Sequence, residues 1–372
     1  MKKILCFAGT RPEAIKLAPV IHALRGLHGQ VEVKLCSTGQ HREMLSQAFQ
    51  DFQLIPDFDL DVMQPNQTLA DLSSRLFHSI DALLAKERPE WILVQGDTTT
   101  VMVASLCAFY RAIKVAHVEA GLRSFNKHAP FPEEMNRRVA SLVADIHFAP
   151  TEQSRKNLEA EGISPQQIVV TGNTVIDALL WMLPIVRAKV PQLPEEVERA
   201  VAVGKKLILI TSHRRENFGS AFEQICLAVQ ELTETHPGIH FIYPVHLNPN
   251  IQKPVQAILG NNEHISLIAP QTYMSFIRLM DLAYLILTDS GGIQEEGSIL
   301  GKPVLVMRDV TERPEGVAAG VSKLVGTKKE RIVAEVGLLL SNTGAYQKMT
   351  IAQNPYGDGK ASERIAKEIL HG

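Results

Sequence analysis

AYLILTDSGGIQEEG, residues 283–297, joins an apolar strand-like run to a glycine-containing turn and the start of a helix. Ser290, Gly291 and Gly292 follow the apolar run and open the helical segment. Backbone N–H groups at a helix start have no intrahelical acceptor, and together with the helix dipole they favour a negatively charged ligand. The stretch therefore predicts a strand–turn–helix unit of a parallel α/β sheet, with a phosphate site at the turn.

Glu296 lies four residues after Gly292, one helical turn further on, where its carboxylate can accept hydrogen bonds from both hydroxyls of a ribose. Arg308 and Arg313 follow downstream and add positive charge. The alternative is an ordinary strand-to-helix turn with Ser290 as N-cap, since short glycine motifs give many false matches. The carboxylate and the arginines favour a nucleotide diphosphate over that alternative.

Length and composition indicate an ordinary globular protein. The 372 residues, 45% hydrophobic and 21% charged, predict two domains with large cores. The net charge of -2 gives no general basic field, so nucleic-acid binding is not expected. Four scattered cysteines without a CxxC pair predict buried free thiols in a reducing compartment.

No targeting or membrane segment is expected. The apolar run in MKKILCFAGTRPE ends at Arg11 and Glu13, and no apolar stretch is long enough to span a bilayer. We therefore expect a cytoplasmic protein that does not contact a membrane.

Strand-like and amphipathic segments alternate along the chain, which predicts stacked βα units and parallel sheets. The first set of strands runs from KILCFA through VEVKLC, WILVQ, KVAHV and IHFAP to IVVTG near residue 170. The same alternation begins again with LILITS and continues through HFIYPV, ISLIA, AYLILT and PVLVM. We predict two Rossmann-like α/β domains, residues 1–172 with a returning helix at 361–372, and residues 173–360.

Each polar motif follows the carboxyl end of a predicted strand, where parallel sheets bind their ligands. GTRPE follows KILCFA, GDTTT follows WILVQ, EAGLRS follows KVAHV, SHRREN follows LILIT, and SGG follows AYLILT. Side chains from both halves are therefore expected to meet in one interdomain cleft.

Arg11 in GTRPE presents a forked cation after the first strand, and Pro12 suits the first helical turn. Such an arginine can bind a diphosphate bidentately. Alternatively, Arg11 pairs with Glu13 at the surface.

Carboxylates follow two neighbouring strands, Asp97 in GDTTT and Glu119 in HVEAGLR. Partial desolvation raises the pKa of carboxylates in such places and suits them to proton transfer. Either one alone could be a helix N-cap or a loop hydrogen-bond acceptor. Because Glu133 and Glu134 follow closely, we favour an acid/base set, with one of these two glutamates serving the helix dipole instead.

His213, Arg214 and Arg215 in SHRREN form a candidate anion site at a strand end. Asp57, Asp59 and Asp61 superficially match a DxD metal site, but their context predicts a solvated loop. The dispersed histidines match no metal motif, so no metal is expected. The first βα turn lacks GxGxxG, so no nicotinamide cofactor is expected.

The ordered motifs GTRPEAIKLAP, QHREML, QGDTTT, HVEAGLRS, FPEEMNRR, TGNTVIDALL, SHRREN, PVHLNPN, TDSGGIQEEG and GKPVLVMRDVTERPE span nearly the whole chain. With them the sequence closely resembles the non-hydrolysing UDP-N-acetylglucosamine 2-epimerases. The resemblance implies the two-domain glycosyltransferase-B fold. It also implies interconversion of UDP-N-acetylglucosamine and UDP-N-acetylmannosamine for surface polysaccharides, and a homodimer.

The resemblance also implies roles for individual residues. The catalytic positions match Asp97, Glu119 and Glu133. His213 counts with them, because it could polarise or protonate a phosphate-linked oxygen, and it also matches a phosphate-side group together with Arg11 and Arg313. Ser290, Gly291 and Gly292 match the phosphate site, Glu296 the ribose site, and Gln271 and Phe276 the uracil site. The implied reaction is elimination of UDP to 2-acetamidoglucal and re-addition of UDP, which needs no cofactor.

Bacterial members often bind a second substrate molecule as an activator. Gln40, Gln67, Arg214 and His246 match that activator site, whereas Glu43 and Asn66 replace a glutamine and an arginine. Losing a cation and gaining a carboxylate predicts weaker binding of an anionic activator.

Two other functions remain open from the sequence. A retaining glycosyltransferase of the same fold would use the same UDP site, but it would not need three convergent carboxylates. A non-catalytic sensor of nucleotide sugars would need none of them.

Overall fold

The computed structural model describes residues 1–39, 42–64, 67–212, 214 and 217–372. The chain forms two compact units, Met1–Trp181 with Tyr356–Gly372, and Met182–Pro355. The chain passes into the second unit within helix α7 (Thr174–Lys189), later than the predicted change at residue 173. It returns at Tyr356, five residues before helix α16 (Ala361–His371), the helix that was predicted to return.

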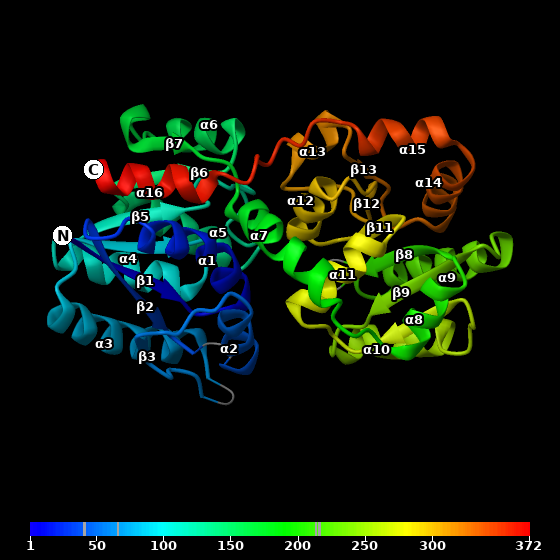
Figure 1. The fold of residues 1–372 in the computed structure, drawn as a ribbon, viewed down its shortest axis with the longest axis horizontal. Coiled ribbons are helices and arrows are strands. Elements are labelled where there is room, and N and C mark those ends of the chain that lie inside the picture. Colours follow the sequence, from blue (N-terminus) through cyan, green and yellow to red (C-terminus); the bar gives the residue numbers. More distant parts are fainter. Residues whose placement is uncertain (40–41, 65–66, 213, 215–216) are drawn as a thin grey trace. The chain divides into compact units, whose positions relative to one another are not determined.

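The first unit is built on a seven-stranded parallel sheet in the order β3-β2-β1-β4-β5-β6-β7 (Figure 1). Its strands are β1 (Lys2–Ala8), β2 (Val31–Ser37), β3 (Phe58–Asp59), β4 (Trp91–Gln95), β5 (Lys114–Val118), β6 (Ile146–Ala149) and β7 (Ile168–Val170). Its helices are α1 (Arg11–Arg25), α2 (Arg42–Asp51), α3 (Leu69–Glu87), α4 (Thr99–Tyr110), α5 (Glu133–Val143), α6 (Glu152–Ala160), α16 and the start of α7, with a 3₁₀ turn at Pro165–Gln167.

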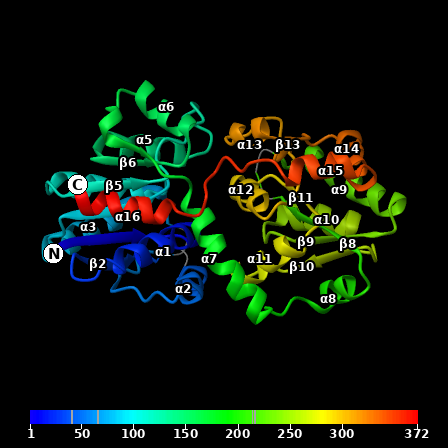
Figure 2. The same cartoon turned by 45° about the horizontal axis from the view of Figure 1, so that its top comes forward.

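The second unit is built on a six-stranded parallel sheet in the order β10-β9-β8-β11-β12-β13 (Figure 2). Its strands are β8 (Lys206–Thr211), β9 (Ile239–Pro244), β10 (Ile265–Ile268), β11 (Leu285–Thr288), β12 (Val304–Val306) and β13 (Ser322–Leu324). Its helices are α8 (Glu195–Ala202), α9 (Ser220–Thr235), α10 (Pro249–Leu259), α11 (Tyr273–Leu282), α12 (Gly291–Ile299), α13 (Pro314–Ala319), α14 (Lys329–Ser341) and α15 (Thr343–Thr350).

Helices form a layer on each face of both sheets. In the first unit α1 packs with α2 and α16, while α3, α4 and α5 pack together in another layer. In the second unit α9 packs with α10 and α14, and α12 packs with α13. Because both faces are covered, the central strands are nearly continuous apolar runs, as in β4, where all of Trp91–Gln95 is buried.

Helix α16 is fixed to the first unit through Asp177 at the start of α7. The Asp177 carboxylate accepts hydrogen bonds from the backbone N–H groups of Ala361 (3.2 Å) and Ser362 (2.7 Å) and from the Ser362 hydroxyl (2.5 Å). These acceptors satisfy N–H groups that the first turn of a helix leaves without partners.

The predicted fold class of two parallel α/β domains is confirmed, and the predicted interdomain cleft stays a prediction. Two edge strands, β3 and β13, were not predicted. Asp57, Asp59 and Asp61 are exposed, as expected of a solvated loop, but Asp59 belongs to β3 rather than to a loop. The Asp57 carboxylate accepts a hydrogen bond from Leu35 N (2.8 Å).

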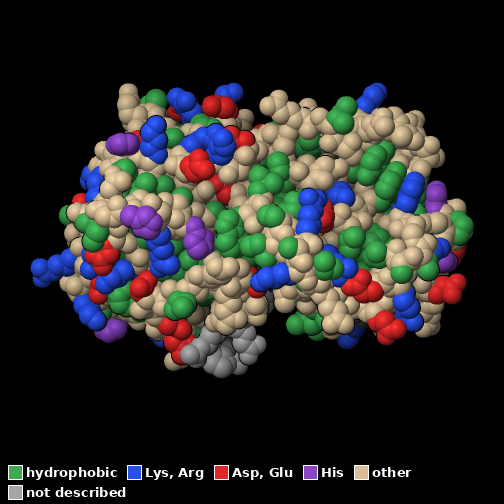
Figure 3. Space-filling model, viewed as in Figure 1, with side chains coloured by type: hydrophobic (Ala, Val, Ile, Leu, Met, Phe, Trp, Pro, Cys, Tyr) green, Lys and Arg blue, Asp and Glu red, His purple; other side chains and the backbone are tan. Residues whose placement is uncertain are grey.

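All four cysteines are buried thiols. Burial raises the pKa of Cys6 to about 12. None of the helices in the described residues has the length and apolar character needed to cross a membrane. On the face shown in Figure 3, acidic and basic side chains are interspersed on each unit.

Candidate functional site

The first unit gathers its candidate residues where β1 and β4 are neighbours in the sheet. From β1 the chain continues to β2 and β3 on one side, whereas β4 to β7 extend on the other side. Ligands of open α/β sheets bind at such a reversal, beyond the carboxyl ends of the strands. GTRPE follows β1, GDTTT follows β4 and EAGLRS follows β5, as predicted. Arg11 is the first residue of α1 and is half-buried.

Glu119 is buried directly after β5, with 8% of its surface exposed. Its carboxylate accepts hydrogen bonds from the Lys16 ammonium, at 2.6 and 2.7 Å to the two oxygens, from Asn173 Nδ2 at 2.9 Å, and from Gln95 Nε2. Its backbone has a φ of 63°, an uncommon conformation for a residue other than glycine that is often found at functional sites. The surroundings therefore fix this carboxylate in position.

Lys16 is a site residue that the sequence analysis missed. It lies on α1 between the buried residues Ile15 and Leu17, and it brings a positive charge to the buried Glu119. A lysine inside the apolar run AIKLAP is the signal that could have identified it.

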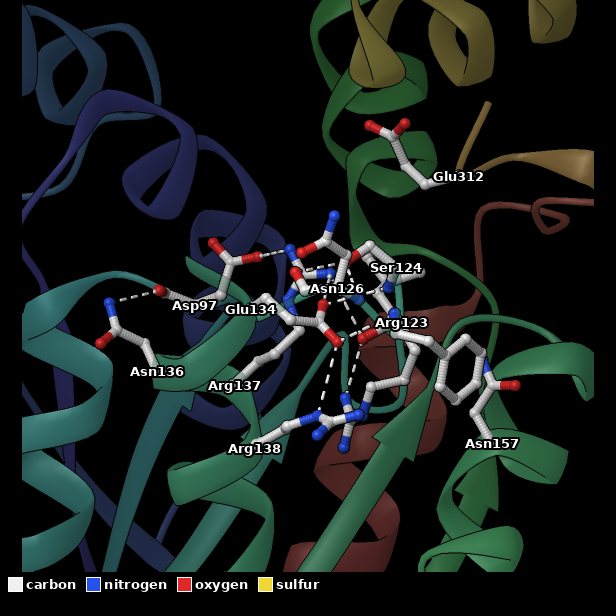
Figure 4. A network of polar contacts seen from close by, with 12 residues as sticks. Asp97, Arg123, Ser124, Asn126, Glu134, Asn136, Arg137, Arg138, Asn157 and Glu312 are labelled. Carbon is white, nitrogen blue, oxygen red and sulfur yellow. Dashed lines mark hydrogen bonds and ion pairs between the residues drawn. The ribbon is translucent and has the colours of Figure 1, made fainter. Parts of the chain in front are cut away.

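Asp97 lies beside Glu119 at this edge of the sheet. A Cβ placed on Gly96, the preceding residue, would stand only 3.8 Å from Glu119 Oε2. The Asp97 carboxylate forms an ion pair with Arg137, and its carbonyl accepts a hydrogen bond from Asn136 Nδ2 at 3.0 Å (Figure 4). Helix α5 therefore orients Asp97, while 26% of the Asp97 side chain stays exposed and can meet a ligand.

Glu133 and Glu134 open α5 but have different surroundings. Glu134 is fully buried, and its carboxylate accepts hydrogen bonds from the backbone N–H groups of Ser124 (3.0 Å) and Phe125 (3.2 Å) (Figure 4). Arg137 lies 3.4 Å from it. Glu133 is half-buried, and its carboxylate has no hydrogen bond or ion pair with any residue that the structure describes. Glu134 therefore supports the loop, and Glu133 is the carboxylate available to a ligand.

Replacing Glu134 by glutamine is expected to lower the stability of the fold, whereas replacing Glu133 by glutamine is expected to lower turnover. Glu134→Gln puts an amide N–H₂ where backbone N–H groups need an acceptor, so it should destabilise the fold by ~2 kcal/mol. Glu133→Gln should leave the unfolding transition unchanged and lower turnover. Thermal unfolding and initial rates of the two variants, measured side by side, check both expectations. A Glu133→Gln variant as active as the wild type would exclude a catalytic role.

Glu13 is a buried carboxylate, 2% exposed, that accepts hydrogen bonds from Gly9 N (2.7 Å), Thr10 N (2.6 Å) and the Thr98 hydroxyl (2.5 Å). Burial raises its pKa to about 7, against the opposing effect of these hydrogen bonds. The alternative in which Glu13 lies at the surface beside Arg11 is therefore wrong. Glu13 links the turn after β1 to the turn that carries Asp97.

The second unit has the same kind of site where β8 and β11 are neighbours. SHRREN follows β8 and SGG follows β11. The buried Asp289 joins the two loops, since its Oδ2 accepts hydrogen bonds from the Ser212 hydroxyl (2.8 Å), Arg214 N (3.0 Å) and Asn217 Nδ2 (3.1 Å). His213 lies outside the described residues.

Gly291 and Gly292 are the first two residues of α12, as predicted, and Ser290 is at the N-cap position. Within the described part of the chain, the Ser290 side chain makes no capping hydrogen bond, so the N-cap alternative does not explain this residue. Among the residues that the structure describes, a Cβ on Gly292 would meet nothing within 4 Å, whereas one on Gly291 would stand 3.2 Å from Glu312 Oε1. The start of α12 is therefore open at Gly292 and faces a carboxylate at Gly291.

Glu296 is 6% exposed on α12 and accepts a hydrogen bond from the Tyr273 hydroxyl at 3.0 Å. Tyr273 begins α11, the helix that also carries Phe276, and Gln271 precedes that helix with its side chain bonded to Ala269 O at 2.7 Å. Tyr273 thus connects Glu296, predicted for the ribose, to the helix that carries Phe276, predicted for the uracil. Tyr273 itself was not predicted from the sequence.

Arg313 is 7% exposed and forms an ion pair with Glu295 of α12. A Cβ on Gly291 would stand 3.6 Å from the nearest atoms of its guanidinium group. This places the cation beside the first residue of α12, and its predicted role at a phosphate site stays a prediction.

The residues predicted for an activator site are divided between the two units. Gln40 and Asn66 lie outside the described residues, and the structure does not describe the Glu43 side chain. Arg214 and His246 belong to the second unit and Gln67 to the first. Arg75 of α3 donates a hydrogen bond to Gln67 Oε1, so a cation that the sequence analysis missed lies beside Gln67.

Among the described residues, no group of three His, Cys, Asp or Glu side chains could hold a metal ion. Instead, the site of each unit combines carboxylates with arginine or lysine side chains. The site of the second unit also contains the N-terminus of α12.

The family model for UDP-N-acetylglucosamine 2-epimerase matches residues 25–370 of this chain. The chain belongs to this family. It is 51% identical over 370 residues to the UDP-N-acetylglucosamine 2-epimerase of Escherichia coli K12, covering 99% of this chain and 98% of that protein. It is 47% identical over 371 residues to the enzyme of that name from Neisseria meningitidis, covering 99% of each.

Solved structures of the epimerase family confirm the fold. The crystal structure of the Neisseria meningitidis UDP-GlcNAc 2-epimerase bound to UDP-GlcNAc matches with a TM-score of 0.91 at 46% identity, over 100% of both chains. The Methanocaldococcus jannaschii enzyme in complex with UDP-GlcNAc and UDP matches with a TM-score of 0.83 at 35% identity, again over 100% of both chains. The predicted resemblance to UDP-N-acetylglucosamine 2-epimerases is thereby confirmed.

Proposed function

We propose that this protein interconverts UDP-N-acetylglucosamine and UDP-N-acetylmannosamine by inverting C2. Membership of the UDP-N-acetylglucosamine 2-epimerase family over nearly the whole chain is the observation that carries the proposal. The second unit binds UDP: the α12 N-terminus and Arg313 bind the diphosphate, Glu296 binds the ribose, and Gln271 and Phe276 bind the uracil. Arg11 and His213 add contacts on the phosphate side.

The carboxylates of the first unit carry out the proton transfer. One carboxylate removes the C2 proton as the bond between C1 and the UDP oxygen breaks, which leaves a C1–C2 double bond in 2-acetamidoglucal. UDP leaves as an anion that cationic groups and backbone N–H groups stabilise. A proton then returns to the opposite face of C2 while the UDP oxygen adds again to C1. Asp97, Glu119 and Glu133 are the candidates for these transfers.

The surroundings of Glu119 and Asp97 are consistent with a role in proton transfer. Glu119 is fixed by Lys16, Asn173 and Gln95, so it is held for a proton transfer of defined geometry. Asp97 keeps a partly exposed carboxylate beside it. A retaining glycosyltransferase would leave C2 untouched and would give these carboxylates no common task.

Incubation of UDP-N-acetylglucosamine with the protein in D2O tests the function. Because C2 loses its proton in every turnover, NMR should show UDP-N-acetylmannosamine with deuterium at C2, and deuterium should also enter the starting sugar as the reaction reverses. Product that keeps its original C2 hydrogen would contradict the elimination route. Transfer of the sugar to an acceptor without exchange at C2 would instead indicate a glycosyltransferase, and binding without either reaction would indicate a sensor.

A further inference from the structure

Glu312 lies between β12 and α13 with arginines around its carboxylate. Arg214 donates to Oε1 at 2.9 Å and Arg308 donates to Oε2. Arg313, the next residue, approaches the Glu312 carbonyl with Nη1 at 3.4 Å. Burial alone would raise the pKa of Glu312, but the positive charges of Arg313, Arg214 and Arg308 lower it to about 2. The three arginines therefore favour the charged form of the Glu312 carboxylate.

The Glu312 carboxylate also faces the start of α12, since its Oε1 lies 3.2 Å from the place of a Cβ on Gly291. The arginines of this region already have carboxylate partners: Arg313 pairs with Glu295, while Arg214 and Arg308 pair with Glu312. A carboxylate between guanidinium groups and a helix N-terminus meets the same donors that a phosphate group would use. Glu295 is 1% exposed at its side chain, whereas Glu312 is 22% exposed and can be displaced more easily.

We propose that Glu312 is an internal counterion of the phosphate site, which holds Arg214 and Arg308 when no anion is bound and competes with the substrate's diphosphate for them. The inference rests on the proposed function, because it assumes that the second unit binds UDP. Glu312 acts through the arginines, so it tunes how tightly the diphosphate is held and takes no part in bond breaking. Such competition limits the affinity for the diphosphate and keeps release of the UDP-sugar product compatible with repeated turnover.

Replacing Glu312 by glutamine removes the competing charge while keeping the shape of the side chain. We expect Glu312→Gln to bind UDP roughly tenfold more tightly than the wild type, since the site gains one net positive charge in partly desolvated surroundings. Uridine, which lacks phosphates, should bind both proteins equally. Isothermal titration of UDP and of uridine measures both. Glu330→Gln, the same change at an exposed position at the start of α14, should leave both affinities at their wild-type values.

Each outcome decides the proposal. Unchanged or weaker UDP binding by Glu312→Gln, with uridine binding intact, would show that Glu312 supports the arginines rather than competing for them. Glu312→Asp keeps the negative charge but shortens the side chain by one methylene group. Its affinity for UDP should therefore rise less than that of Glu312→Gln, and its affinity for uridine should stay at the wild-type value. If Glu312→Gln does not fold, the absence of any gain in Glu312→Asp overturns the proposal by itself. A wild-type protein that binds neither ligand would overturn the proposed function together with this inference.

Discussion

Asp97→Asn and Glu119→Gln are each expected to lower turnover of UDP-N-acetylglucosamine by at least ~100-fold, while UDP still binds. Each change replaces a carboxylate by an amide of the same shape that cannot accept a proton. The expected UDP site lies in the second unit, so its affinity should change little. Initial rates and titration with UDP, measured on the same samples, separate the loss of chemistry from the loss of binding.

Two other paired carboxylates of the first unit, Asp81 and Glu87, supply matched controls. Asp81 pairs with Arg111 much as Asp97 pairs with Arg137, and Glu87 accepts hydrogen bonds from Lys3 and Lys34, each at 2.8 Å, as Glu119 does from Lys16. Asp81→Asn and Glu87→Gln lose comparable ion pairs away from the candidate site, so both should keep wild-type turnover. Near-normal activity of Asp97→Asn and Glu119→Gln would reject their catalytic assignment.

The sequence predicted the strands that carry the site, because each is a buried apolar run followed by a polar motif. It did not predict β3 or β13, which have two and three residues. Each contains a single apolar residue, Phe58 or Leu324, so neither reads as an apolar run. The strands β7 (IVV) and β12 (VLV) also have three residues, but they are apolar throughout and were predicted. Neither β3 nor β13 carries a residue of the candidate site, so the prediction of the site did not depend on them.

The supporting residues were harder to predict than the carboxylates. Lys16 and Glu119 are 103 positions apart, and Asp289 and Ser212 are 77 apart. No local pattern records such a pairing, because it arises only when the sheet brings the strand ends together. The different roles of Glu133 and Glu134 could not be predicted from the sequence either, although the two residues are neighbours. Both looked like helix-opening carboxylates, and only the turn of α5 decides that Glu134 points into the protein.

Gly121→Ala is expected to destabilise the first unit by at least ~3 kcal/mol, since the new Cβ would collide with backbone. Gly121 has a φ of 88°, and its Cβ would stand 2.2 Å from Ser154 O and 2.8 Å from Ser154 C. Helix α6 also fixes this loop, as Asn157 Nδ2 donates to Gly121 O at 2.9 Å. The loop cannot move away from α6 without disturbing Glu119, two residues earlier, so turnover should fall together with stability.

Gly162→Ala is the matched control, because it carries the free-energy cost of a left-handed alanine without the steric collision expected for Gly121→Ala. Gly162 has nearly the same φ, 87°, but a Cβ there would meet no described residue within 4 Å. Its replacement should therefore cost only the ~1 kcal/mol of a left-handed residue other than glycine. Thermal unfolding followed by circular dichroism compares the two variants. Equal shifts of the midpoint would mean that the contact with α6 does not constrain the loop, whereas a much larger shift for Gly121→Ala would show that α6 holds the turn that carries Glu119.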